Sequence, residues 1–342
     1  GYNGAYNTGV EVGVRNPYDG TRIAGGSSSG SAAALGARMA LAALGTDTGG
    51  SMRIPPALNG CASLRPSAGR YSDRGVIPIA RSRDTVGPMA LCMADVALLD
   101  GLITGEYAMP SVVLGELRLG VPSEFWENLD EDTYEQAVAA AEKLSGHGVT
   151  LVPIKDAGLH ALNEPVGFPV VIHEAYDCMV DYLRDYGHAM TIEQLAEKIH
   201  SPDVRWIYDH WVLPRKMPVG DQLVDVAPAY QAAQNGGRQA LLERYQMLFE
   251  LHQLDALLFP TTAVVAPLAN DEVNQPSIFE RLIQNTEPAA SAGLPCIQLP
   301  VGLGSRSGLP VGMELDGPPG CDRRLLAIGQ MLEGLFGRVP RA

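Results

Sequence analysis

The sequence contains few lysines and few cysteines, and neither residue type forms a functional pattern by itself. Lysine occurs at only four of the 342 positions, namely 143, 155, 198 and 216. The five cysteines are odd in number, widely spaced and without a C-x-x-C pair. Such spacing disfavours a disulfide framework and is typical of reduced thiols in a reducing compartment. We therefore expect a cytoplasmic protein.

Long apolar runs and basic clusters are missing as well. No run of about 18 apolar residues occurs, so the sequence predicts no membrane-spanning helix. The formal net charge of -14 disfavours nucleic acid and anionic membranes as partners.

The seven histidines lack metal-ligand spacing, and His173-Glu174 has no second histidine four residues on. We expect neither a metal nor another cofactor. Hydrophobic residues make up 46% of the chain, enough for a large core.

Two loops rich in glycine and serine are the most informative part of the chain. Residues 25–30 read GGSSSG and residues 45–55 read GTDTGGSMRIP. Residues 31–44 between them are mostly Ala, Leu and Met, which predicts one helix with Gly36 as its weak position. Glycine lets a backbone approach a ligand closely and leaves N–H groups uncovered, and such groups stabilise developing negative charge. This layout around Ser51 indicates acyl transfer.

Three other interpretations of the first loop are weaker. Residues 26–30 fit the G-x-S-x-G nucleophile elbow, but an elbow follows a buried strand and residues 14–22 are polar and turn-rich. A phosphate-binding P-loop ends in Gly-Lys-Ser or Gly-Lys-Thr, which this loop lacks. A flexible linker is disfavoured because an apolar segment follows at once.

The two loops together resemble the amidase signature family of serine hydrolases. Every fixed position of the family pattern G-G-S-S-x-G to G-T-D-x-G-G-S-x-R-x-P is present over residues 25–55. Further segments are also typical of the family: residues 64–70, 84–89, 259–262, 292–295 and 308–312. The match is weakest between about residues 155 and 250. The resemblance implies an α/β fold, with a mixed β-sheet core covered by helices on both faces.

The resemblance also implies a Ser–cis-Ser–Lys mechanism. Ser51 corresponds to the nucleophile, and Ser27, 24 residues earlier, corresponds to the serine that relays its proton. A cis peptide bond is implied between Gly26 and Ser27. Attack of Ser51 on the amide carbonyl gives an acyl-enzyme that water then hydrolyses.

The remaining site residues follow from the same resemblance. The oxyanion hole is implied to consist of backbone N–H groups around Thr48, Gly49 and Gly50. Asp47 and Arg53 bracket the nucleophile loop, and we expect them, together with Gly26 in the first loop, to support the loops rather than to catalyse. Metal ligands are not implied.

The chain departs from the family pattern at the lysine. The family lysine lies well upstream of the relay serine, and no lysine precedes Ser27 here. Lys155 lies in a similar local sequence but follows a helix–turn–strand pattern, so we expect it on the surface. We accordingly expect residues 1–342 to form a single amidase domain that lacks its N-terminal segment.

Alternating strand and helix patterns agree with this fold. Strands are predicted at residues 117–121, 150–153, 256–259, 296–300 and 311–315. Helices are predicted at residues 133–144, 239–252 and 323–336, and the middle of the chain, about 165–237, is mostly helical. Trp206, Trp211, Tyr176 and Tyr208 fall in this middle part, where packing is the default role for aromatic residues.

The substrate expectation rests on two segments. Residues 82–89 and 119–130 are most similar to indoleacetamide and mandelamide hydrolases within the family. We therefore predict hydrolysis of a small aryl-acetamide to the carboxylic acid and ammonia, by an enzyme whose partner is a small-molecule amide. Two alternative functions stay open: the A-type component of a glutamyl-tRNA amidotransferase, and a non-catalytic fragment or binding module without the lysine. A homodimer also stays open as the assembly.

Overall fold

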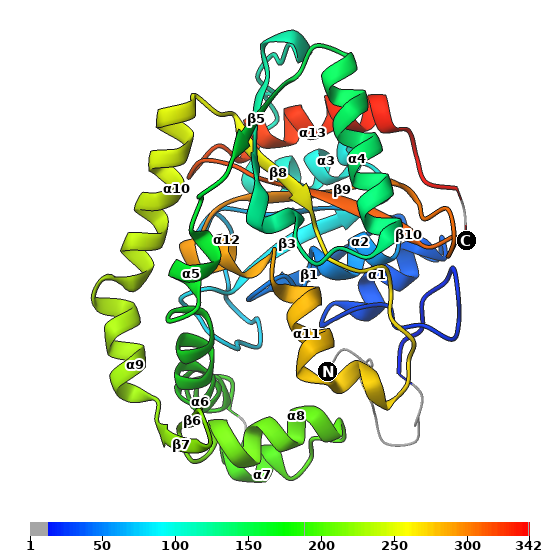
Figure 1. The fold of residues 1–342 in the computed structure, drawn as a ribbon. Helices are drawn as coiled ribbons and strands as arrows, with labels where there is room; N and C mark the ends of the chain where they lie inside the picture. The colour runs from blue at the N-terminus through cyan, green and yellow to red at the C-terminus, as the bar shows by residue number, and fades with distance from the viewer. Residues whose placement is uncertain (1–12, 188, 341) are drawn as a thin grey trace.

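An eight-stranded mixed sheet forms the centre of the computed structural model, which describes residues 13–187, 189–340 and 342 (Figure 1). The strand order is β1-β3-β2-β9-β10-β8-β4-β5. β4 runs parallel to β5 and β8, and the other neighbours are antiparallel. These strands are β1 (Ala42–Asp47), β2 (Ala62–Arg65), β3 (Thr85–Ala90), β4 (Arg118–Pro122), β5 (Thr150–Ile154), β8 (Ala256–Pro260), β9 (Cys296–Leu303) and β10 (Pro310–Asp316).

Helices cover both faces of this sheet, as predicted. The α-helices are α1 (Ser29–Gly36), α2 (Ile54–Leu58), α3 (Met93–Thr104), α4 (Glu131–Gly146), α5 (Leu159–Asn163), α6 (Gly167–Asp185), α7 (Ile192–Ala196), α8 (Pro202–Ile207), α9 (Ala227–Ala232), α10 (Arg238–His252), α11 (Pro276–Ile283), α12 (Glu287–Ala292) and α13 (Asp322–Phe336). Shorter 3-10 segments are η1 (Leu114–Glu116), η2 (Ser123–Trp126) and η5 (Asp271–Asn274), and π-helical segments are η3 (Tyr208–Val212) and η4 (Ala233–Gly237). In the described residues, no helix is long and apolar enough to span a membrane.

The side-chain alternation of β9 and β10 divides the core into two layers. Ile297 and Leu299 of β9 and Met313 and Leu315 of β10 point to one face, where they pack with α3, α4 and α13. The opposite face receives α5, α10 and α12. Strand residues alternate between faces, so the intervening positions of β9 and β10 all point to this second face. Among them, Cys296 and Gln298 of β9 and Glu314 and Asp316 of β10 are polar, which matters for the site above them.

Local signals explain the long surface helices. Asp130 caps α4 by accepting a hydrogen bond from Thr133 N at 2.8 Å. The buried residues Ala137, Ala140 and Leu144 recur at helical spacing and face the sheet. The strands and helices predicted from residue 117 onward are confirmed, with ends that differ by a few residues at most.

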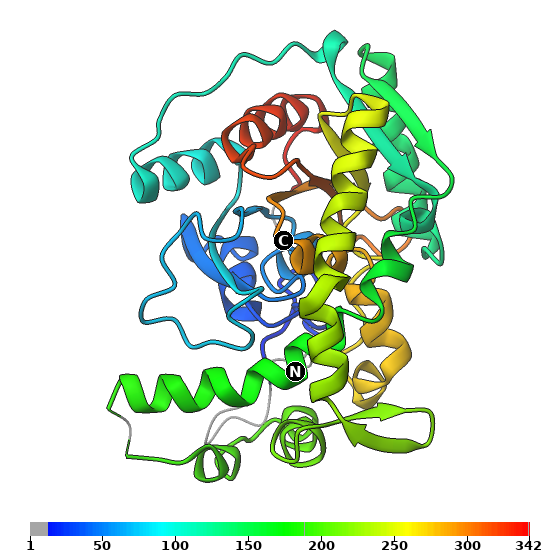
Figure 2. The same cartoon turned by 90° about the vertical axis from the view of Figure 1, so that its left-hand side faces the viewer.

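The middle of the chain forms a separate helical layer. α6 to α8 lie together below the sheet in both views, beside the hairpin of β6 (Lys216–Val219) and β7 (Gln222–Asp225) (Figures 1 and 2). Trp211 contacts Phe168 and Trp206 edge-on, with ring centroids 5.0 and 4.9 Å apart. Tyr176 and Tyr208 join the same apolar cluster. These aromatic residues therefore pack against one another, as expected.

The prediction of one helix over residues 31–44 is wrong beyond Gly36. A Cβ at Gly36 would lie 2.8 Å from the Asn59 carbonyl oxygen, so the helix end packs directly on a neighbouring backbone. The chain then turns through Arg38, which has a positive φ of 61°. Ala42 to Asp47 form β1 because they pair with β3, a partner that local composition does not reveal.

β1 lies at the edge of the sheet, and serines of α1 and its N-cap occupy its outer side. Ser28 Oγ donates to the Thr46 carbonyl and accepts from the Thr46 N–H, both at 3.2 Å. Ser31 Oγ donates to the Leu44 carbonyl at 2.9 Å. These bonds satisfy backbone groups that an edge strand ordinarily exposes.

Truncation of Phe259 is expected to destabilise the fold. Phe259 is fully buried in β8 and packs edge-on against Phe125 with centroids 4.4 Å apart. We expect Phe259→Ala to lower the free energy of unfolding by about 3–5 kcal/mol. Leu251→Ala, at a residue that is 68% exposed, is the control and should change it little. Equal losses in urea unfolding would contradict this picture of the core.

Candidate active site

The two serine loops meet at the end of β1. Ser28 N donates to the Ser51 carbonyl at 3.2 Å, which joins the first loop directly to the second. The peptide bond between Gly26 and Ser27 is cis, as the family resemblance implied. Ser51 is half-buried and Ser27 is exposed. The structure thus brings together the two loops that carry these serines.

Asp47 is the centre of the nucleophile loop. Its carboxylate is fully buried and accepts hydrogen bonds from Gly50 N at 2.9 Å and Met52 N at 3.2 Å. These two residues flank Ser51, so one side chain fixes the backbone on both sides of it. Asp47 therefore holds the backbone of the nucleophile loop.

Two buried arginines neutralise this carboxylate. Arg53 reaches Asp47 through Nε and Nη2, each at 3.0 Å, and Arg65 Nη1 lies 2.7 Å from the same carboxylate. Burial by itself would raise the pKa of Asp47, but the two guanidinium groups outweigh burial and hold that pKa well below its usual range. The carboxylate consequently stays charged at neutral pH.

Backbone N–H groups around Ser51 differ in whether they already donate a hydrogen bond to a protein acceptor. In the described part of the chain, the N–H groups of Thr48, Gly49 and Ser51 donate to no protein acceptor, whereas the Gly50 N–H is directed at Asp47. Gly50 has a positive φ of 138°, and a Cβ there would lie 2.2 Å from Thr286 Oγ1. Only glycine fits this turn.

Side chains from two other segments hold the same loop. Thr286 Oγ1 donates to the Gly49 carbonyl at 2.6 Å. Thr48 Oγ1 donates to Asp84 at 2.5 Å, and Asp84 also accepts from the N–H groups of Ile79 and Ala80. Burial raises the pKa of Asp84 above its usual value. The loop that carries Ser51 is therefore fixed from three directions.

A second wall of the site contains an ion pair that sequence reasoning missed. Arg83 Nη2 lies 3.2 Å from Glu287, and Arg83 Nη1 donates to the Gly167 carbonyl at 2.7 Å. Asn163 binds the other oxygen of Glu287 at 2.9 Å. A Cβ on Gly49 would lie 3.4 Å from Arg83, so this pair adjoins the nucleophile loop. Arg83 directly precedes the family-like segment of residues 84–89, so its position in the sequence could have indicated a role. Glu287 lies in none of the family-like segments.

Asp84 also lines a cavity of about 500 Å³. It lies between the segment that contains Arg81 and the C-terminal part of α6. Its walls combine apolar, aromatic and charged groups from Asp73, Arg74, Val76, Pro78, Arg81, Asp84, Tyr182, Asp185 and Tyr186. This volume lies within the usual range for small-molecule sites.

The four lysines lie away from the serine loops. Lys143, Lys155, Lys198 and Lys216 all have exposed side chains. In the part of the chain that the structure describes, none of them forms a hydrogen bond or ion pair with either loop. Lys155 is a surface residue, as predicted, and its carbonyl accepts a hydrogen bond from Ser123.

Comparisons with known sequences agree with this geometry. A family model described as Amidase matches residues 5–326. Over 341 residues, the chain is 41% identical to mandelamide hydrolase of Pseudomonas putida, covering 99% of this chain and 67% of that protein. Over 332 residues it is 39% identical to indoleacetamide hydrolase of Agrobacterium vitis, covering 94% and 68%. The chain thus spans about two thirds of the length of these relatives.

Solved structures show the same fold. An amidase crystal structure superposes with a TM-score of 0.78 at 31% identity, over 95% of this chain and 69% of that one. The A-type component of glutamyl-tRNA(Gln) amidotransferase from Thermotoga maritima gives a TM-score of 0.71 at 27% identity, over 96% and 70%.

The Asp47 network predicts a strong effect of a neutral substitution. Asp47→Asn leaves Arg53 and Arg65 buried beside an uncharged amide, and we expect a loss of about 3–5 kcal/mol in the free energy of unfolding. Because the folded pKa is depressed, the carboxylate stabilises the protein above its unfolded pKa of about 3.9, and this stabilisation is lost as pH falls below it. The deficit of the variant should therefore shrink in acid.

Urea unfolding at pH 7 and below pH 4 measures this effect. Asp95→Asn, at an exposed position on α3, is the matched control and should behave like the parent protein. A loss at Asp47 no greater than at Asp95 would contradict the role of this carboxylate.

Proposed function

Because this chain belongs to the amidase family, we propose that it hydrolyses the C–N bond of a small aryl-acetamide to a carboxylic acid and ammonia. The relatives at 39–41% identity are named for mandelamide and indoleacetamide, and both of these amides carry an aromatic group. The observation that carries the proposal is the junction of the two serine loops, where Ser28 N donates to the Ser51 carbonyl at 3.2 Å.

Ser51 is the proposed nucleophile. It is half-buried, and its flanking residues are fixed through Gly50 N and Met52 N by the Asp47 carboxylate. A nucleophile held in one geometry reacts without first losing conformational freedom. Attack of Ser51 Oγ on the amide carbon gives a tetrahedral intermediate, which collapses to an acyl-enzyme with release of ammonia. Water then attacks the acyl-enzyme and releases the acid.

Backbone N–H groups of the same loop are the proposed oxyanion hole. Thr48, Gly49 and Ser51 have N–H groups that donate to no acceptor in the described residues, so they are available to the oxyanion. Gly50 shapes the turn through its positive φ, whereas its own N–H donates to Asp47 and is not a donor of the hole. Preorganised donors of this kind typically contribute about 3–4 kcal/mol each to the barrier reduction.

Ser27 is the proposed proton relay. Its loop is joined to the nucleophile loop by the Ser28 N–H to Ser51 carbonyl bond. In the proposed cycle Ser27 accepts the proton of Ser51 and returns it to the leaving nitrogen. The four lysines of this chain are exposed, and we assign none of them as the base that deprotonates Ser27.

The A-type component of an amidotransferase is the second candidate, because such a protein shares this fold at a TM-score of 0.71. That role requires a partner assembly and tRNA, and the net charge of -14 disfavours contact with nucleic acid. The names of the relatives at 39–41% identity, mandelamide hydrolase and indoleacetamide hydrolase, support an aryl substrate instead.

Substitution of the serines tests the assignment of roles. We expect Ser51→Ala to abolish labelling by an activated phosphonyl fluoride, because the attacking oxygen is gone. Ser27→Ala should slow labelling of Ser51 by about 10²–10⁴-fold without abolishing it, since removal of a proton relay weakens a nucleophile but does not delete it. Mass spectrometry of the labelled peptide locates the adduct.

Ser123→Ala, at an exposed serine outside both loops, is the control and should label like the parent protein. An adduct on Ser28 or Ser29 in place of Ser51 would contradict the assignment and favour the nucleophile-elbow interpretation.

The relative rates for different amides test the substrate class. We expect kcat/KM for ammonia release from mandelamide or indoleacetamide to exceed that for glutamine by at least about tenfold, the discrimination that burial of an aryl group supplies. The test compares the kcat/KM values of the two kinds of amide with each other and does not depend on the absolute rate, because no lysine in the described structure contacts the serine loops. Equal rates, or a preference for glutamine, would favour the amidotransferase alternative.

A further inference from the structure

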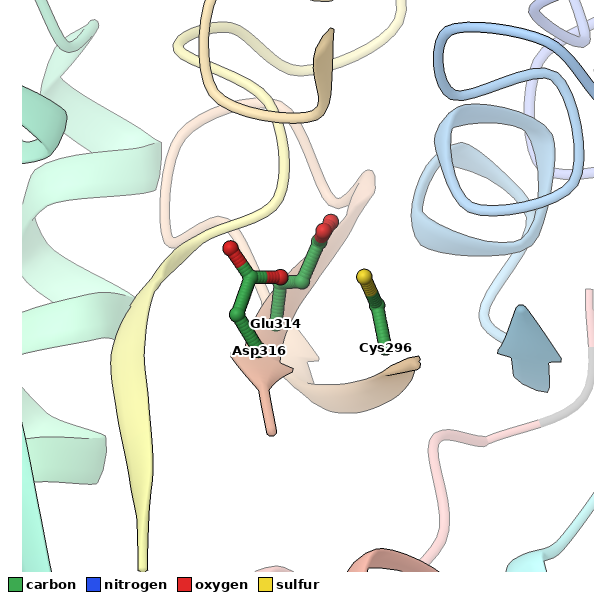
Figure 3. A group of neighbouring side chains, drawn as sticks. All are labelled: Cys296, Glu314 and Asp316. Carbon is green, nitrogen blue, oxygen red and sulfur yellow. The ribbon is translucent and has the colours of Figure 1, made fainter. Parts of the chain in front are cut away.

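A row of polar residues lies buried beneath the nucleophile loop. Cys296 and Gln298 of β9 and Glu314 and Asp316 of β10 all have zero exposed surface. Glu314 lies directly across from Gln298, and Asp316 lies across from Cys296, so the four share one face of the sheet. Figure 3 shows Cys296, Glu314 and Asp316 gathered on this face. Buried acids of this kind are rare without a compensating partner.

Two carboxyl oxygens in this row lack a partner. Arg53 Nη1 binds Glu314 Oε1 at 2.5 Å, and Tyr245 OH donates to Asp316 Oδ2 at 3.1 Å. Among the described residues, the second oxygens, Glu314 Oε2 and Asp316 Oδ1, have no hydrogen-bond partner. One oxygen of each carboxyl group and the Cys296 sulfur lie within 4.8 Å of one another. An unpaired carboxylate in the core is strongly unfavourable.

The formal charges of the network do not balance if both acids are ionised. Arg53 and Arg65 contribute two positive charges, whereas Asp47, Glu314 and Asp316 would contribute three negative ones. All five side chains are fully buried. A single positive charge is needed to compensate the excess.

We propose that Glu314 and Asp316 share one proton, and that this singly charged pair positions Arg53 and through it the Ser51 loop. The pair then carries one negative charge, and the buried network is neutral. A proton between the two carboxyl groups also gives their unpaired oxygens a hydrogen bond. Two carboxylates that share a site ordinarily bind one proton in this way.

The surroundings favour a proton over a metal ion as the compensating charge. The Arg53 guanidinium already contacts Glu314 and lies 3.8 Å from the Cys296 sulfur, so a second cation there meets repulsion. Burial raises the pKa of Cys296 well above its usual value, which leaves a thiol, a poor metal ligand. Burial likewise raises the pKa of Glu314 strongly and that of Asp316.

The pair is connected to the nucleophile through bonds already described. Glu314 holds Arg53, Arg53 holds Asp47, and Asp47 holds the N–H groups of Gly50 and Met52 on either side of Ser51. Glu314 and Asp316 are therefore positioning residues and contact no reacting atom. This connection to turnover rests on the proposed function, whereas the shared proton does not.

The shared proton makes stability depend on pH. The ionisable groups that face the pair are Arg53, Arg65 on β2, Asp47 on β1, Tyr245 on α10 and Cys296 on β9. Because the folded pKa values of the acids are raised, the native protein keeps a proton that the unfolded chain loses above about pH 4.5. Stability is thus greatest in mild acid, and the folding equilibrium constant falls by about tenfold per pH unit as pH rises.

Single and double amide substitutions test the proposal. Glu314→Gln and Asp316→Asn each leave one carboxylate, so either variant should keep the native fold and the Ser51 labelling rate within about threefold. Each should also remove the pH dependence of unfolding that the shared proton causes. The double variant leaves two buried guanidinium groups, Arg53 and Arg65, with the single carboxylate of Asp47, and its labelling rate should fall by at least about 10²-fold, with reduced stability. Asp156→Asn, at an exposed acid, controls for the change in net charge.

Infrared spectroscopy provides a readout that is independent of activity. The folded parent protein should show a carbonyl band of a protonated carboxylic acid at neutral pH, and this band should vanish in both single variants and in the double variant. A stoichiometric metal ion found by elemental analysis of the purified protein would overturn the proposal. The absence of the band, or single variants as damaged as the double variant, would overturn it too. Failure of Ser51 labelling with the band intact would instead count against the proposed function.

Discussion

The geometry of the site depends on one buried carboxylate, that of Asp47. Its oxygens hold the backbone on both sides of Ser51 and two guanidinium groups from different elements. Burial of a carboxylate costs several kcal/mol, and this cost is offset only while Arg53 and Arg65 stay in place. Arg53 also contacts Glu314 on β10. One buried network of charged side chains therefore joins the nucleophile loop, the edge strand β1 and the central strands β2 and β10.

The sequence predicted the cis bond before Ser27 better than it predicted the secondary structure of the segment that follows. The two loops and the cis bond before Ser27 follow from residues that repeat a family pattern, because that pattern encodes backbone conformation. The same residues gave a wrong helix after Gly36. An Ala- and Leu-rich segment has high helix propensity, and only its pairing with β3 makes residues 42–47 a strand.

The sequence did not reveal which charged side chains pair with each other when they lie far apart in the chain. Glu287 meets Arg83 across 204 positions, and Glu314 meets Arg53 across 261. No local period or short motif connects such residues. Neither Glu314 nor Asp316 stood out in the sequence, because the pairing of β9 with β10 and the helices packed on this face are what turn two ordinary acids into a buried pair.

The bonds from Ser28 and Ser31 to β1 have a consequence for how this sheet interacts with other polypeptides. Edge strands ordinarily accept another strand, and here the outward groups of Thr46 and Leu44 are already bonded to serines of α1 and its N-cap. A polypeptide that extended the sheet at this position would have to displace Ser28, and so would pull the first loop away from Ser51. Growth of the sheet along this part of β1 and an intact pair of serine loops are mutually exclusive.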